Sequence, residues 1–133
     1  MSIIVVDASV AASWLFDDEA EAYASAVLDS LGTTDGVAPL LWQFEMRNIL
    51  LSARRRNRIT QKEMVDRLAG LAAIPLRLDG DADLDHAFAL ADRHRLSYYD
   101  ALYLELTLRL SAQLASLDAA LVKAAKLEGA HYN

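Results

Sequence analysis

The chain has 133 residues, of which 54% are hydrophobic and 24% charged, with 5 Gly and 2 Pro; this is one domain's worth of sequence and excludes a disordered or low-complexity chain. Cysteine is absent, which excludes disulfides, thiolate metal ligands and cysteine nucleophiles. The net charge of −6 argues by itself against a nucleic-acid-binding protein, because such proteins are usually basic.

Short apolar segments alternate with helical patterns along the chain. Ile3–Val6 is apolar and β-branched, which is typical of a strand buried on both faces. Further strands are predicted at residues 36–39, 74–78 and 114–117, with 130–132 as a candidate last strand. Helices are predicted at residues 10–16, 19–31, 40–56, 60–72, 81–95, 97–112 and 118–127. This alternation predicts one α/β domain over residues 1–133, with helices on both faces of a parallel sheet.

The sequence contains no recognisable targeting segment. Its N-terminal apolar run ends at Asp7, whereas a signal peptide needs ~7–15 apolar residues after a basic start. No stretch approaches the ~18 apolar residues of a membrane span. We therefore expect a cytoplasmic protein of a bacterium or archaeon.

Three aspartates are expected near one end of the sheet. Asp7 and Asp118 directly follow predicted strands, and ligand sites in parallel α/β folds lie outside the carboxyl ends of the strands. Asp100 begins the 97–112 helix and projects roughly 160° from Glu105 and Arg109, which we take as the solvent-exposed face. Helix capping explains any one aspartate alone. Their joint placement predicts a carboxylate cluster.

A fourth acidic residue, Glu45, lies in the middle of the 40–56 helix. It projects roughly 180° from the polar face that Gln43, Arg47 and Arg54 define, so it points inward. An inward carboxylate is costly unless it is paired, functional or open to a solvent-lined groove. Asn48, three residues further on, is placed to orient it.

Convergence of these four carboxylates requires a counter-charge. Two carboxylates ~4 Å apart repel by ~4 kcal/mol at an effective dielectric of ~20. A divalent cation is the simplest counter-charge, and without Cys or a nearby His its ligands are all oxygen. Oxygen ligands favour Mg²⁺ or Mn²⁺, or else Ca²⁺, over zinc. Such a site positions a phosphate and activates water, which predicts phosphodiester hydrolysis.

Four blocks of the sequence resemble PIN-domain proteins, and within that superfamily the VapC-type toxins of prokaryotic toxin–antitoxin pairs. The blocks are VVDASV at residues 5–10 with Trp14 following, PLLWQFEMRNIL at 39–50, LSYYDALY at 96–103 and LASLDAAL at 114–121. Their order and spacing span nearly the whole chain. Residues 58–94 match no motif.

The resemblance implies a three-layer α/β/α sandwich with a central, mostly parallel sheet and a Mg²⁺- or Mn²⁺-dependent endoribonuclease. Its catalytic, metal-holding quartet maps onto Asp7, Glu45, Asp100 and Asp118. We expect Asp7 and Asp100 to contact the metal directly, and Glu45 and Asp118 to complete the site through water or a second ion. Ser116 fills a Ser/Thr position of the family. The implied partners are an RNA substrate, a cognate antitoxin protein and a second copy of the chain.

Several other residues are candidates for a supporting or catalytic role in this chemistry. Asn48 and Ser116 are candidates to support the metal ligands without touching the metal. Ser9 and Ser97 are excluded as nucleophiles because no His base stands beside them. The tyrosines of the 97–112 helix are assigned to core packing because of their helical spacing; they are Tyr98, Tyr99 and Tyr103.

Two basic runs are candidates to contact RNA phosphates. The denser run consists of Arg54, Arg55, Arg56 and Arg58. These arginines also suit the C-terminal end of a helix, which is the favoured interpretation. The smaller run is Arg93, His94 and Arg95.

Two alternatives remain open from the sequence: a structure-specific DNA nuclease with the same metal chemistry, and a catalytically inactive PIN-like module that binds RNA or protein. The complete acidic quartet weighs against the inactive module. Without the four site acids, 15 acidic residues face 13 basic ones. The acidity that argued against nucleic acid is therefore largely the predicted metal site itself.

Overall fold

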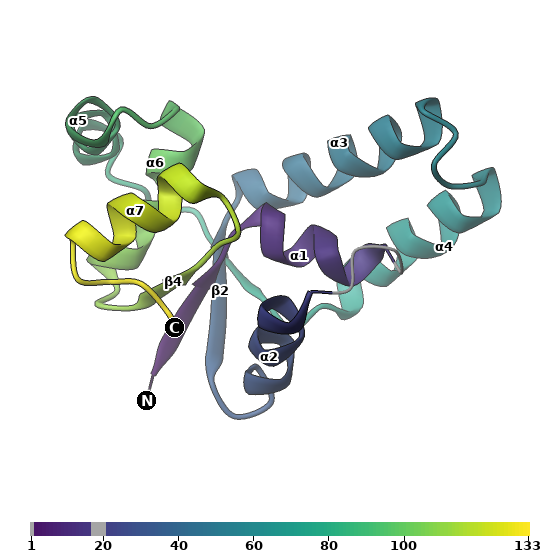
Figure 1. Cartoon of the computed structure of the whole chain (residues 1–133), viewed down its shortest axis with the longest axis horizontal. Helices are drawn as coiled ribbons and strands as arrows, with labels where there is room; N and C mark the ends of the chain where they lie inside the picture. The colour runs from purple at the N-terminus through teal and green to yellow at the C-terminus, as the bar shows by residue number, and fades with distance from the viewer. Residues whose placement is uncertain (1, 17–20) are drawn as a thin grey trace.

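The computed structural model of the chain, which describes residues 2–16 and 21–133, contains a four-stranded parallel sheet in the order β3–β2–β1–β4 (Figure 1). The strands are β1 (Ile3–Val6), β2 (Asp35–Pro39), β3 (Arg77–Asp79) and β4 (Gln113–Ala115). β1 pairs with β2 on one side and, through the register Val6↔Ala115, with β4 on the other. Segments near the two ends of the chain therefore lie side by side in the sheet, with β4 as an edge strand.

The helices follow the predicted order. They are α1 (Ala8–Leu15), α2 (Ala22–Ser30), α3 (Leu41–Arg55), α4 (Gln61–Gly70), α5 (Leu84–His94), α6 (Tyr98–Arg109) and α7 (Ala119–Leu127), with a short 3₁₀ helix at Leu71–Ala73. The capping box of Thr60 and Glu63 is present at the start of α4, and Ser97 caps α6. None of the helices formed by the described residues is long and apolar enough to cross a membrane.

Residues of β1 pack into two different cores, because successive side chains of a strand point to opposite faces. Val5 joins the larger core together with Met46 of α3 and Leu104 of α6. Val6 joins a smaller core with Val27 of α2. Helices therefore cover both faces of the sheet. The predicted three-layer α/β/α fold is confirmed.

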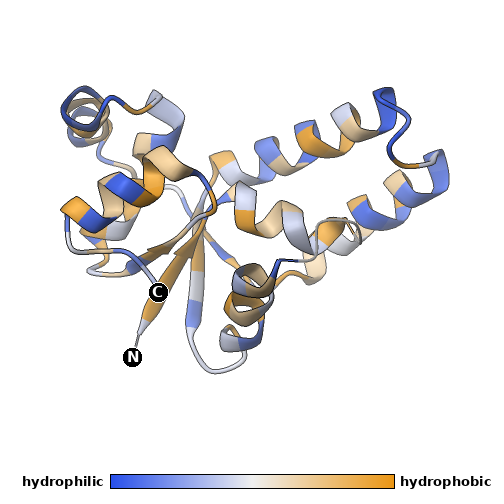
Figure 2. Cartoon of the chain, viewed as in Figure 1, coloured by the Kyte–Doolittle hydropathy of each residue, from blue (hydrophilic) through white to orange (hydrophobic). Residues whose placement is uncertain are grey.

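The α3–α4 hairpin extends away from the sheet on one side of the molecule, and α5, α6 and α7 lie together on the other side (Figure 1). β1 is hydrophobic throughout, whereas the loop between α3 and α4 is mostly hydrophilic (Figure 2). The carboxyl ends of β1 and β4 lie between these two parts of the molecule.

Three predicted elements differ from the structure. The 74–78 strand is displaced to Arg77–Asp79 because Pro75 has no N–H for a ladder, and the Leu76 N–H instead donates to Ile74 O in a turn. The candidate strand at 130–132 makes a single bridge, between Leu114 and His131. The second helix begins at Ala22, and the first residues predicted for it lie partly outside the described residues.

The solvent-exposed face predicted for α6 is right for Arg109, which is exposed, but wrong for Glu105. Glu105 is completely buried, because α6 packs against α5, α7 and three strands. Arg109 Nε donates to Glu105 Oε2 at 2.7 Å, and its Nη2 donates to Asp79 Oδ1 at 2.9 Å. These hydrogen bonds from Arg109 hold the pKa of Asp79 below its ordinary value. Arg109 therefore neutralises two carboxylates and ties α6 to the end of β3.

Candidate functional site

The parallel pairing of β1 and β4 brings Asp7 and Asp118 to the same edge of the sheet. Asp7 directly follows β1 and caps α1, where it accepts a hydrogen bond from Val10 N at 3.1 Å. Asp118 follows the end of β4 and caps α7, where it accepts from Leu121 N at 2.9 Å. Both aspartates therefore act as helix caps while they lie at the strand ends, as predicted.

Two serine hydroxyls hold the buried carboxylate of Asp7. Ser9 Oγ donates to Oδ1 at 2.6 Å, and Ser116 Oγ donates to Oδ2 at 2.5 Å. Together with the Val10 N–H, three of the roughly four acceptor positions of the carboxylate are occupied. The position that remains is on Oδ2. No donor among the described residues fills it, so Oδ2 keeps one acceptor position for a further ligand.

The same two hydroxyls also position the loop between β4 and α7. Ser9 Oγ accepts from Leu117 N at 2.9 Å, and Ser116 Oγ accepts from Asp118 N at 3.0 Å. Asp7 and Asp118 are thus joined through Ser116. Ser116 is predicted from the sequence as a supporting residue, whereas Ser9 is considered there only as a nucleophile. The position of Ser9, two residues after the capping Asp7, is the sequence signal for its supporting contact.

Glu45 lies half-buried on α3 and is oriented by α6. Tyr103, which is 1% exposed, donates its hydroxyl to Glu45 Oε1 at 2.5 Å. Asn48 is exposed, and its predicted support of Glu45 stays a prediction. Tyr103 packs in the core as predicted, but its contact with Glu45 was missed. The signal was its spacing of i+3 from Asp100, which places both on one helix face.

Asp100 lies in the first turn of α6, where Ser97 rather than Asp100 provides the cap. The other tyrosines of this helix differ in exposure. Tyr98 is half-buried, whereas Tyr99 is 60% exposed, so its assignment to the core is wrong.

Asp100 interacts electrostatically with each of the other three carboxylates. Burial raises the pKa of Asp7, and the charge of Asp100 adds to this effect. Burial also raises the pKa of Glu45, with further contributions from Asp100 and Asp7. The pKa of Asp100 is raised by burial and by the charge of Asp118. Asp7, Glu45 and Asp100 are therefore held where their negative charges are unfavourable.

The described residues supply no cation to this cluster. None of the ion pairs formed within residues 2–16 and 21–133 involves Asp7, Glu45, Asp100 or Asp118. Nor do any three Asp, Glu or His side chains of these residues already stand in metal-binding geometry. The donor set still fits Mg²⁺ or Mn²⁺. All its donors are carboxylate oxygens, Asp7 Oδ2 keeps an acceptor position that no described donor fills, and no cation of the described residues pairs with these charges.

The structure places the denser basic run far from the carboxylates. Arg54, the first residue of this run, lies nine residues after Glu45, which is a rise of ~14 Å along α3. Its Nε is buried without a partner, and Arg58 lies over the ring of Phe16 at 4.1 Å. Part of this run therefore packs within the hairpin. Arg55 and Arg56 are exposed at its tip.

Fold and site together define a parallel three-layer α/β/α protein with a cluster of carboxylates at the strand ends. The chain belongs to the PIN domain family, whose model matches residues 4–127. Comparison with curated proteins gives no significant match.

Several solved structures share this fold at low sequence identity. PAE2754 from Pyrobaculum aerophilum is 18% identical, with a TM-score of 0.72 over 98% of this chain and 88% of its own. VapC20 from Mycobacterium tuberculosis, described as a sarcin–ricin loop cleaving toxin, is 19% identical, with a TM-score of 0.64 over 91% of this chain and 94% of its own. A toxin–antitoxin complex from Klebsiella pneumoniae is 15% identical, with a TM-score of 0.58 over 86% of each chain.

Proposed function

We propose that this protein is a Mg²⁺- or Mn²⁺-dependent endoribonuclease that acts as the toxin of a toxin–antitoxin pair. The observation that carries the proposal is the cluster of Asp7, Glu45, Asp100 and Asp118 in a member of the PIN domain family. Burial raises the pKa of Asp7, Glu45 and Asp100, the charges of neighbouring site carboxylates add to this effect, and no cation of the described residues pairs with them. A protein keeps such an arrangement at a cost in stability, which favours a functional role.

Each side chain has a distinct task in this proposal. Asp7 would hold the metal through Oδ2, while Ser9 and Ser116 keep its carboxylate in one orientation. Asp100 would hold the metal from the start of α6, and Glu45 and Asp118 complete the site. The bound ion would supply Lewis-acid stabilisation of the scissile phosphate and a more acidic water. No carboxylate is assigned as the general base.

The partners are proposed from the similar structures. VapC20 is described as a toxin that cleaves the sarcin–ricin loop, which supports RNA as the substrate class. The Klebsiella complex pairs a toxin with an antitoxin, which supports an antitoxin partner for this chain. Large exposed apolar side chains, Phe44 at 63% and Phe88 at 70%, offer surface for a second copy or for that antitoxin.

The proposal is tested by removing one charge at a time. Asp7→Asn and Asp100→Asn should each reduce RNA cleavage by more than about 100-fold, because a ligand contributes at least as much as its supporting residues. Asp92→Asn, on the exposed surface of α5, is the matched control and should cleave like the wild type. Circular dichroism and thermal melting of each variant check that the fold is retained.

The same assay separates the alternatives. Equal cleavage of RNA and DNA, or cleavage of DNA alone, would replace the ribonuclease with a DNA nuclease. No cleavage by the wild type with Mg²⁺ or Mn²⁺, together with no metal binding by calorimetry, would favour an inactive module. Full cleavage by either site variant would refute the assignment of these carboxylates.

A further inference from the structure

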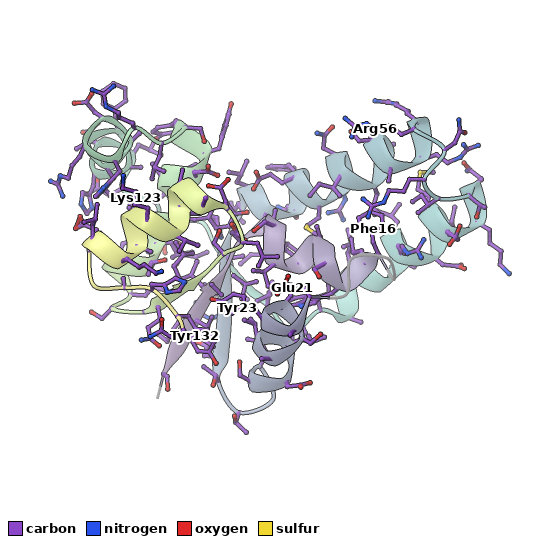
Figure 3. All side chains as sticks on the ribbon, viewed as in Figure 1. Phe16, Glu21, Tyr23, Arg56, Lys123 and Tyr132 are labelled. Atoms are coloured by element: carbon purple, nitrogen blue, oxygen red, sulfur yellow. The ribbon has the colours of Figure 1, made fainter. Side chains whose placement is uncertain are left out.

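The basic side chains of the protein gather at two places on opposite sides of the carboxylates. One group lies on the α3–α4 hairpin, where Figure 3 shows Arg56 near the tip, and the other includes Lys123 of α7. Elsewhere, Arg77 and Arg109 are engaged in ion pairs with Asp35 and with Asp79. A negatively charged strand that crosses the carboxylates therefore meets basic residues on either side.

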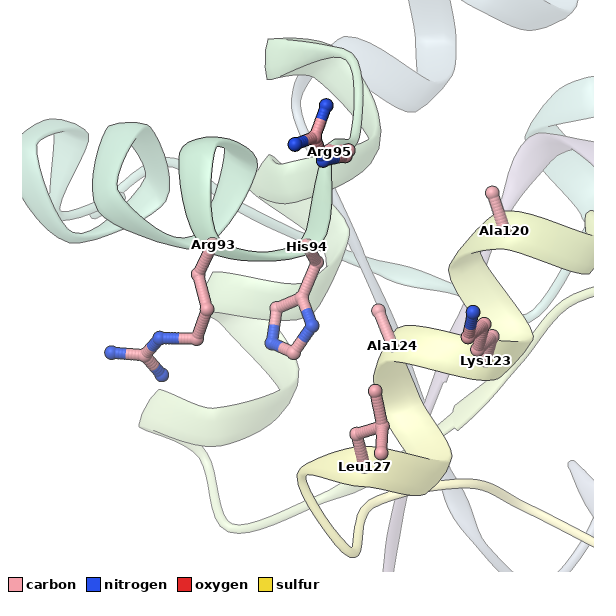
Figure 4. A pocket seen from close by; sticks show the side chains of 7 residues that line it. All are labelled: Arg93, His94, Arg95, Ala120, Lys123, Ala124 and Leu127. Carbon is pink, nitrogen blue, oxygen red and sulfur yellow. The ribbon is translucent and has the colours of Figure 1, made fainter.

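A pocket of about 380 Å³ lies between the end of α5 and α7 (Figure 4). This volume is within the ~300–1,000 Å³ of small-ligand sites. Its lining consists of Arg93, His94, Arg95, Ala120, Lys123, Ala124 and Leu127. Small and apolar side chains of α7 form one wall, and cationic side chains stand around it. This composition suits a phosphate with its attached ribose or base.

Two of the basic residues that line this pocket, Arg93 and His94, are already partnered. Glu128 accepts a hydrogen bond from Arg93 at 3.3 Å, and its Oε2 lies 2.9 Å from His94 Nε2. Arg95 and Lys123 are exposed, and neither forms an ion pair within the described residues. The net positive charge of the pocket therefore comes from these two side chains.

The chain places this pocket beside two of the site carboxylates. Lys123 lies five residues after Asp118, which is ~7.5 Å along α7. Arg95 ends α5 and lies five residues before Asp100, with Ser97 between them as the cap of α6. Five residues also turn the helix by roughly 140°, so this rise is only the axial part of the separation between Lys123 and Asp118. The pocket therefore adjoins the start of α6 and the first turns of α7, which carry two of the site carboxylates.

We propose that Arg95 and Lys123 form a phosphate-binding subsite for the substrate strand, beside the carboxylates at which the strand is cut. This inference rests on the proposed function, since the ligand is the flanking backbone of the nucleic acid to be cut. The subsite holds the strand in register against the carboxylates. The net charge of −6 otherwise opposes such binding.

The test compares two lysines of one helix. Lys123 lines the pocket, whereas Lys126, three residues further on, is exposed on α7 and does not line it. Lys123→Gln and Lys126→Gln make the same change of charge in the same element. Arg95→Asn is a second variant. Arg95 has φ of 54°, and Asn tolerates this left-handed backbone.

Binding is measured without cleavage. Fluorescence anisotropy follows a labelled single-stranded RNA of about 12 nucleotides in EDTA, with NaCl between about 50 and 200 mM. Lys123→Gln and Arg95→Asn should each weaken binding roughly two- to fivefold, as expected for one partly screened ion pair. Each should also lower the slope of log K against log [salt] by about 0.7. Lys126→Gln should leave both quantities unchanged.

Cleavage in Mg²⁺ provides the second measurement. Loss of the subsite should raise KM with kcat unchanged, because the contact exists in both ground and transition states. Equal effects of Lys123→Gln and Lys126→Gln would overturn the subsite, as would a wild type that fails to bind RNA at about 50 mM NaCl. Wild-type binding that depends on Lys123 but is followed by no cleavage would instead refute the proposed nuclease.

Discussion

Two groups of buried and half-buried carboxylates in this protein have opposite electrostatic surroundings. Glu105 and Asp79 share the guanidinium of Arg109, and the pKa of Asp79 lies below its ordinary value. Asp7 and Asp100 have no such partner, and the pKa of each is raised, mainly by burial. Burial alone therefore does not identify a functional carboxylate. The absence of a protein cation beside it, within the described residues, is the more useful sign.

The largest effect on stability is expected in the group of Glu105 and Asp79, whose charges Arg109 compensates. Arg109→Met leaves Glu105 completely buried without a cation, which should lower the free energy of unfolding by about 3–5 kcal/mol. Urea denaturation measures this loss. Arg77→Met, which removes an exposed ion pair with Asp35, is the matched control and should cost less than about 1 kcal/mol. Similar losses in the two variants would show that the buried network has no special weight.

A smaller effect on stability is expected at Glu45, a site carboxylate that accepts a hydrogen bond from the neutral hydroxyl of Tyr103. Tyr103→Phe removes the hydrogen bond to Glu45 and should cost about 1–2 kcal/mol. This hydrogen bond lowers the pKa of Glu45, so its loss should raise that pKa further. The acidic limb of the pH–rate profile should then move to higher pH. Tyr98→Phe, whose hydroxyl contacts Leu84 O at 3.3 Å, should leave the profile in place.

The smallest effect concerns the pH dependence of stability in EDTA. The raised pKa values of Asp7, Glu45 and Asp100 mean that the folded state binds more protons than the unfolded state. The free energy of unfolding should therefore fall as the pH rises from about 4.5 through these raised values, and level off above them.

Asp100→Asn sharpens this measurement, because it removes one of the repelling charges. Its urea midpoint should fall less between mildly acidic and neutral pH than that of the wild type. Asp92→Asn, whose side chain is exposed, should behave like the wild type. A wild-type midpoint that rises over the same interval would contradict the raised pKa values.

The sequence predicts the site region better than the compensated network. Asp7 and Asp118 can be predicted because each follows an apolar strand. Each also caps the helix that follows it, and a helix cap depends on residues close together in the sequence. The network is missed because Asp79 lies 30 residues from Arg109, and no local pattern links them. The pair of Glu105 and Arg109 looks like a solvated i,i+4 pair, although α6 is buried around Glu105.

Contacts between distant elements account for the remaining differences. The hydroxyl of Tyr103 reaches Glu45 across 58 residues, and that of Ser116 reaches Asp7 across 109. Ser116 is predicted from the sequence because it fills a Ser/Thr position of the PIN domain family, not because its contact with Asp7 is apparent there. Tyr99 was assigned to the core by helical spacing alone, but spacing does not tell which side of α6 lacks a neighbour.

The pairing of β1 with β4 also determines when the site can form during protein synthesis. Asp7 leaves the ribosome early, but Ser116 and Asp118 are added more than a hundred residues later. Translation adds about 5–20 residues per second, and domains fold as their chain emerges. A nascent chain that ends before residue 116 lacks the Ser116 hydroxyl, which donates a hydrogen bond to Asp7 Oδ2. It also lacks Asp118, the last of the four carboxylates. Under the proposed function, an unfinished chain therefore cannot attack the messenger that encodes it.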